Sequence, residues 1–284
     1  MLIQDLTTIL ARRLRPLRLL IPALSGALIF VNVAAAQGPV LNEGWELLAR
    51  YLYRDAGQVF EQTPSTNTRL ISLGRAASLL NEPPVTNGKI EQAEQLLHQI
   101  VTGESNDTTA LYARYLLARI YHMHREASVP EIEAAYRAVL QAGPGTAITQ
   151  IAASHLALVL LYQRTDLSLD QRLGLAQELE SAAVGPALPE VAMSYYRLLA
   201  DASLFYERVS PQVVDWLEQA HAIGSVDQLR QIDLALQIAE TARAVGQAEK
   251  AQKYYREFLA NAVPTDQRYN TVKLRLHELE DASS

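Results

Sequence analysis

The strongest constraint on the fold is a helical spacing of apolar residues over most of the chain after Gln37. Apolar residues recur every three or four positions, and no strand-length segment shows sustained alternation of apolar and polar residues. Glycine and proline interrupt the pattern at intervals, for example at Pro83-Pro84, Gly143-Pro144 and Gly185-Pro186. Because this period is typical of amphipathic helices and Gly or Pro ends them, the sequence predicts an all-α chain of about eleven short helices.

The clearest repeating unit covers residues 231–264. Its first predicted helix carries small residues, a glycine makes the turn, and the second helix carries small and aromatic residues before a proline. These are Ile238, Ala239, Ala242, Gly246, Ala248, Ala251, Tyr255, Phe258 and Pro264. The unit resembles the tetratricopeptide repeat (TPR), in which small residues let two antiparallel helices approach closely. The resemblance implies an α-solenoid of stacked antiparallel helical hairpins, a TPR-like superhelix.

Weaker copies of this unit precede it. They cover residues 68–101, 110–144, 149–186 and 190–224. We therefore expect about five TPR-like hairpins within residues 67–264. Residues 37–66 are expected to form an N-terminal capping helix or hairpin, and residues 265–284 a C-terminal capping helix and tail, because stacks need polar-faced ends to avoid open-ended association.

The first 36 residues show the three-part pattern of a secretory signal peptide. Four arginines between Arg12 and Arg18 precede an uncharged stretch from Leu19 to Asn42, and Ala34-Ala35-Ala36 provides an A-x-A end. We expect cleavage after Ala36. The alternative is an uncleaved membrane anchor, since about 18 to 20 apolar residues just span a bilayer. Either interpretation predicts export to the periplasm or the extracellular space, because the basic end stays on the cytoplasmic side.

Charge and composition disfavour several classes of function. The chain has a formal net charge of −6; residues 1–36 carry +3, so the remainder carries −9. An acidic body repels phosphate backbones, and we therefore expect no nucleic-acid partner. The chain contains no cysteine, which excludes disulfides, zinc–thiolate sites and cysteine nucleophiles.

The sequence lacks three common catalytic motifs. It has no Walker-type phosphate loop, no His-Glu-x-x-His and no Gly-x-Ser-x-Gly. The closest histidine pair, His122 and His124, is two residues apart, which separates the rings by about 200° on a helix. We therefore expect no catalytic residues, no metal site and no cofactor, and we interpret the protein as a non-enzyme.

The first helix of each hairpin lines the concave surface of such a stack. The register predicts that this surface presents Arg75, Tyr112, Tyr115, Arg119, His122, Arg197, Asp201, Glu240 and Arg243. Arg75, Arg119 and Arg197 form a cationic line in an acidic protein. The two tyrosines offer rigid contact area. The alternative is that these arginines only pair with glutamates on adjacent helices, as surface arginines commonly do.

The sequence therefore favours an exported scaffold or adaptor that binds a protein or peptide segment in its concave groove, within an envelope assembly. One alternative is an accessory or superhelical domain of a cell-wall-acting enzyme system. Another is a structural subunit that polymerises end to end. The charged surface of the final helix disfavours this alternative. An uncleaved N-terminal segment would attach the protein to the membrane.

Overall fold

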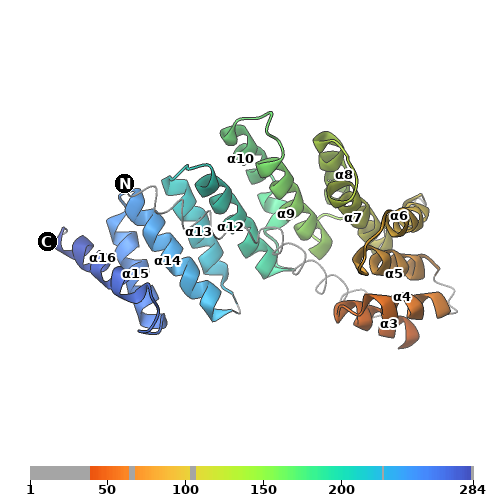
Figure 1. Cartoon of the computed structure of the whole chain (residues 1–284). Helices are drawn as coiled ribbons and strands as arrows, with labels where there is room; N and C mark the ends of the chain where they lie inside the picture. The colour runs from red at the N-terminus through yellow and green to blue at the C-terminus, as the bar shows by residue number, and fades with distance from the viewer. Residues whose placement is uncertain (1–38, 64–67, 103–106, 226, 283–284) are drawn as a thin grey trace. The chain divides into compact units, whose positions relative to one another are not determined.

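The protein is helical throughout the part that the structure describes. The computed structural model describes residues 39–63, 68–102, 107–225 and 227–282 (Figure 1). These ranges contain fourteen α-helices and no strand, which confirms the all-α prediction. The predicted signal peptide or anchor, residues 1–36, lies outside the described residues. Within them, no helix has both the length and the apolar character needed to cross a bilayer.

The helices follow one another along the chain with short connections. In order they are α3 (Pro39–Ala49), α4 (Tyr53–Gln62), α5 (Thr68–Asn81), α6 (Asn87–Val101), α7 (Thr108–Met123), α8 (Val129–Ala142), α9 (Ala147–Tyr162), α10 (Leu169–Gln177), α11 (Glu180–Ala183), α12 (Pro189–Phe205), α13 (Pro211–Ile223), α14 (Gln228–Ala244), α15 (Ala248–Asn261) and α16 (Tyr269–Asp281).

The predicted count of about eleven helices is too low, because some helices end without glycine or proline. Between α3 and α4 the chain turns through Tyr51, which adopts a left-handed φ of 62°. That conformation favours glycine, so the sequence gives no warning of the turn. The segment between Leu169 and Ala183 likewise divides into α10 and α11 at Glu178 and Leu179.

The chain forms two compact units, Met1–Val159 and Leu160–Ser284, with the boundary inside α9. In the first unit, consecutive helices from α3 to α8 pack in pairs, and α5 also contacts both α3 and α7. In the second, consecutive helices from α12 to α16 pack in pairs, and α10 and α11 pack against α12. Each unit therefore contains helical hairpins stacked in chain order, consistent with the predicted α-solenoid.

Polar contacts in the second unit repeat at a nearly constant sequence separation. Six of them join residues 35 or 36 positions apart: Gln237–Asp201, Lys250–Asp215, Tyr254–Glu218, His221–Glu257, Arg268–Asp233 and Arg275–Glu240. One hairpin and its turns account for this separation, which is close to the roughly 34 residues of a TPR. The architecture is thus repeat-like, with each helix bonded to its counterpart one hairpin away.

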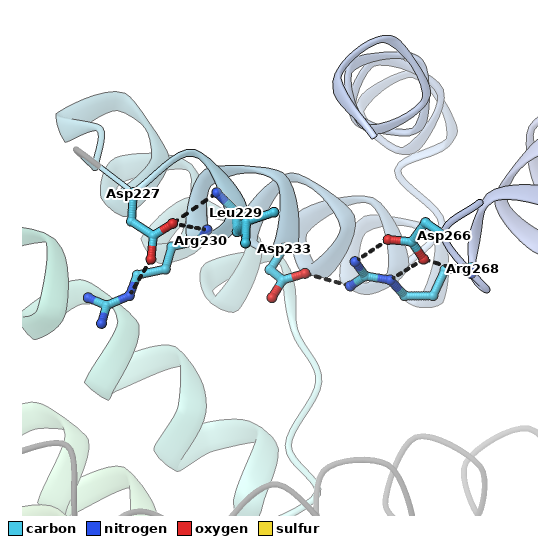
Figure 2. A network of polar contacts seen from close by, with 6 residues as sticks. All are labelled: Asp227, Leu229, Arg230, Asp233, Asp266 and Arg268. Atoms are coloured by element: carbon cyan, nitrogen blue, oxygen red, sulfur yellow. Dashed lines mark hydrogen bonds and ion pairs between the residues drawn. The ribbon is translucent and has the colours of Figure 1, made fainter. Parts of the chain in front are cut away.

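The start of α14 and the start of α16 are tied together by ionic side chains (Figure 2). Asp227 caps α14 by accepting hydrogen bonds from the backbone N–H of Leu229 (3.0 Å) and of Arg230 (3.4 Å). Arg268, just before α16, donates to Asp233 of α14 (2.5 Å) and to Asp266 (2.7 Å). Val272 is the buried side chain of α16, so polar contacts hold much of this terminal helix.

Helices α3, α4 and α5 meet around the ring of Phe60 in α4. Phe60 is buried and packs edge-on against Trp45 of α3, with ring centroids 5.2 Å apart. A Cβ atom at Gly74 of α5 would lie 2.4 Å from this ring, and one at Gly44 of α3 would lie 2.7 Å from it. The two glycines therefore provide the space in which the ring sits, on both sides.

Candidate functional site

The arginine predicted nearest the N-terminus takes part in an ion pair. Arg75 lies on α5, and its Nη2 is 3.3 Å from Oε1 of Glu61, which lies in the last turn of α4. Both side chains are exposed. Arg75 therefore follows the alternative that we considered for the cationic line, in which an arginine pairs with a glutamate on the adjacent helix.

The two tyrosines of the predicted surface are buried. Tyr112 is 5% exposed and Tyr115 is fully enclosed, although both lie on α7 as predicted. The reason is that α7 packs against α5, α6 and α8, which leaves little of its surface open. The expectation that these two rings offer free contact area is therefore wrong.

Tyr115 instead belongs to a buried polar cluster around α7, which we call the α7 cluster: Tyr115, Arg119, His122, Tyr136 and His155. The hydroxyl of Tyr136 lies 3.1 Å from Nδ1 of His122 and 3.4 Å from Nδ1 of His155. The hydroxyl of Tyr115 is also 3.4 Å from Nδ1 of His155. The cluster thus links α7 to α8 and α9 within the first unit.

Burial keeps the histidines of the α7 cluster uncharged. It lowers the pKa of His155 to about 3, and the positive charge of Arg119 adds to the effect. The pKa of His122 is lowered for the same two reasons. Burial raises the pKa of Tyr136. Arg119 is consequently the charged member of the α7 cluster at neutral pH.

Arg119 has no anionic partner within the described part of the chain. Its side chain is half-buried, and its Nε–H is enclosed without a hydrogen-bond acceptor. A guanidinium that loses water without gaining a partner is unfavourable, so such a group favours an anionic ligand. The structure brings together Tyr115, Arg119 and His122 of the predicted set. Of these three, Arg119 is the one that could bind an anionic group.

A second arginine of this kind lies on α12 in the other unit. Arg197 is half-buried, its Nε–H is enclosed without an acceptor, and no ion pair joins it to a carboxylate among the described residues. Asp201, one turn later, accepts a hydrogen bond from Nε2 of Gln237 (3.0 Å). Burial raises the pKa of Asp201, against the opposing effects of Arg197 and of this hydrogen bond.

The last two predicted residues, Glu240 and Arg243, lie on α14 and form an ion pair with each other. Glu240 of α14 accepts hydrogen bonds from the hydroxyl of Tyr255 (2.7 Å) and from Nη1 of Arg275 (2.5 Å). Nη2 of Arg243 lies 3.5 Å from the other carboxylate oxygen. Glu240 thus joins α14 to α15 and α16, and Arg243 is ion-paired like Arg75.

Phe205, the last residue of α12, is not among the surface residues predicted from the sequence. Its ring is 49% exposed, and its centroid is 5.9 Å from that of Tyr162. The hydroxyl of Tyr162 is buried without a hydrogen-bond partner in the described structure. The sequence spacing could have indicated Phe205. Arg197, Asp201 and Phe205 are spaced four residues apart and therefore share one face of the helix.

Arg119 of α7 and Arg197 of α12 are suited to binding an anionic group. Among the described residues, no three His, Asp or Glu side chains gather as a metal site would require. A hollow of about 130 Å³ between α14 and α15 is smaller than the ~300–1,000 Å³ typical of small-molecule sites. The arginines on α7 and α12 offer hydrogen-bond donors and positive charge, which are the means of binding an anionic group on a partner.

Comparison with known proteins finds no family model, no curated protein and no solved structure that matches this chain.

Proposed function

We propose that the protein is an exported scaffold or adaptor that binds a segment of another protein within an envelope assembly. The observation that carries the proposal is the pair of unpaired, half-buried guanidinium groups of Arg119 and Arg197. Desolvating a charge without a partner costs up to several kcal/mol, so neither group stabilises its own unit. A carboxylate on a partner would form charge-assisted hydrogen bonds with either of them.

The contrast with the other predicted arginines supports this assignment. Arg75 pairs with Glu61, and Arg243 pairs with Glu240, so each neutralises a charge within the protein. Arg119 and Arg197 lie on α7 and α12, the first helices of their hairpins, and no carboxylate of the described residues pairs with them. In a chain whose body carries a net charge of −9, unpaired cations such as these would attract an acidic partner.

The proposal of export rests on the sequence pattern of residues 1–36. It is tested by fractionating cells that express the full chain and sequencing the N-terminus of the mature protein. Recovery from the envelope or the medium with Gln37 as the first residue supports export with cleavage. Recovery of the full chain from the cytoplasm overturns the proposal, and recovery of the uncleaved chain in the membrane assigns the segment as an anchor.

Partner binding is tested by co-purification from an envelope extract of the source organism. The baits are the wild-type protein, Arg119→Glu, Arg197→Glu and the control Arg256→Glu, which removes an exposed arginine that pairs with Glu280. Circular dichroism confirms that each bait is folded. The proposal is supported if the wild type and the control retain a defined partner and either Arg119→Glu or Arg197→Glu loses it. Equal recovery by all four baits contradicts the role given to Arg119 and Arg197.

A further inference from the structure

The face of α12 that carries Arg197, Asp201 and Phe205 combines a half-buried cation without an ion pair and an exposed aromatic ring. We infer that this face, called the α12 face below, binds an extended peptide segment in which an acidic residue and an apolar or aromatic residue lie four positions apart. The carboxylate pairs with Arg197, and the apolar side chain packs on Phe205. This inference rests on the proposed function and names the chemistry of the partner.

The unsatisfied polar groups beside the α12 face are both hydrogen-bond donors. They are the Nε–H of Arg197 and the hydroxyl of Tyr162, each buried without a partner in the described structure. Asp201 influences both electrostatically but bonds to neither, and its Oδ1 accepts a hydrogen bond from Gln237. Because the guanidinium of Arg197 forms no ion pair among the described residues, a carboxylate suits it better than a neutral oxygen does.

The aromatic end of the α12 face is held rigidly. Phe205 packs edge-on against Tyr162 (69° between ring planes) and against Tyr206 (5.0 Å between centroids, 87°). Tyr206 is fixed in turn, because Nη1 of Arg172 donates to its hydroxyl (2.9 Å) while the guanidinium lies 4.4 Å from the ring centroid. A ring that is already immobilised loses little entropy when an apolar side chain packs on it.

The distance between the two anchors sets the spacing of the segment. Arg197 and Phe205 are eight residues apart, which corresponds to about 12 Å along a helix. An extended peptide advances about 3.3 Å per residue, so four residues span about 13 Å. In an extended segment, residues four apart also point to the same side, whereas residues three apart point to opposite sides. The α12 face therefore selects Glu-x-x-x-Phe, or the same pair in reverse order.

The inference is tested with short peptides and the isotope-labelled protein. The probes are acetyl-Gly-Ser-Glu-Ser-Thr-Ser-Phe-Ser-Gly-amide and its reverse-order counterpart, whose blocked ends leave the glutamate as the sole carboxylate. Matched peptides replace the glutamate by glutamine, replace the phenylalanine by alanine, or shorten the spacing to three. NMR titration measures the dissociation constant of each. A probe should shift the resonances of Arg197, Asp201 and Phe205, and each altered peptide should bind roughly tenfold more weakly.

Protein variants assign the binding to the α12 face. Arg197→Gln and Phe205→Ala should each weaken binding of the probe by roughly tenfold, whereas Arg256→Gln should leave it unchanged. The inference is overturned if neither probe binds, if the glutamine peptide binds as tightly, or if Arg256→Gln weakens binding as much as Arg197→Gln. Binding of N-acetylglucosamine oligomers at the same resonances, without binding of the peptides, would also overturn it.

The same variants separate this inference from the proposed function. If a partner co-purifies with the wild type and is lost only with Arg119→Glu, the scaffold function stands and the role of the α12 face fails. If no bait retains a partner, the proposed function itself fails.

Discussion

Replacing Gly74 by alanine should destabilise the first unit, even though alanine is ordinarily the better residue inside a helix. The added Cβ would lie 2.4, 2.6 and 2.6 Å from three ring atoms of Phe60, distances that real Cβ atoms do not tolerate. The ring has little room to retreat, because Gly44 faces it closely on α3 and Trp45 packs against it at 5.2 Å. Either the ring or the α4–α5 packing must move.

The magnitude follows from two opposing effects. Overpacking a close-packed core costs about 1–3 kcal/mol, since neighbouring side chains leave their preferred rotamers. Removing a glycine from a helix interior contributes about 0.5–1 kcal/mol of stability. The net expectation for Gly74→Ala is a loss of up to about 2.5 kcal/mol in the free energy of unfolding of the first unit, with a midpoint of about 1 kcal/mol.

Gly57→Ala is the matched control, because Gly57 lies inside α4 of the same unit. A Cβ at this position would meet the Cβ of Ser78 at 3.5 Å, an ordinary van der Waals distance. The helix propensity effect then acts alone, and this variant should be about 0.5–1 kcal/mol more stable than the wild type. The two glycine replacements are thus predicted to have opposite signs.

Tryptophan fluorescence measures the effect unit by unit. The chain has two tryptophans, Trp45 in the first unit and Trp216 in the second. In a Trp216→Phe background, urea unfolding followed by the fluorescence of Trp45 reports on the first unit, with circular dichroism as a second probe. If Gly74→Ala proves as stable as Gly57→Ala, the ring of Phe60 is not confined as described, and the reasoning is refuted.

Three further predictions concern charge. Because the pKa of His155 is about 3 when folded and 6.5 when exposed, the unfolded chain binds the proton more strongly. Stability should therefore fall as the pH drops below about 6.5, by up to about 1.4 kcal/mol per pH unit, and urea unfolding of His155→Gln at pH 7 and pH 5 should show a smaller loss. Arg119→Met and Arg197→Met should each keep or raise the melting temperature while weakening partner capture, since each removes an unpaired desolvated charge; marked destabilisation of both would contradict that description. Arg275→Gln should speed hydrogen exchange across Tyr269–Asp281, because Arg275 ties α16 to Glu240 and Val272 is the buried side chain of the helix; unchanged exchange there, measured by mass spectrometry, would show that other contacts hold α16.

The sequence was most informative where structure depends on neighbours along the chain. The spacing of Ile238, Ala242, Tyr255 and Phe258 around the turn at Gly246 predicted the hairpin of α14 and α15, which the structure contains. Helical faces are local properties, because residues three and four apart lie together whatever surrounds the helix. For the same reason the all-α class followed from the apolar spacing and the glycine and proline breaks.

Tertiary packing decided which of the predicted surface residues remain available. Tyr115 and Arg119 are one helical turn apart on α7, yet the tyrosine is enclosed by its bond to His155 while the guanidinium lacks an acceptor. Arg75 and Arg197 likewise look equivalent in sequence, but Glu61 neutralises only the first. These outcomes depend on side chains that come from other helices, from 14 residues away for Glu61 to 40 for His155. Periodicity identifies the face on which a residue lies, and only the packed neighbours determine whether that residue is covered, paired or free to bind.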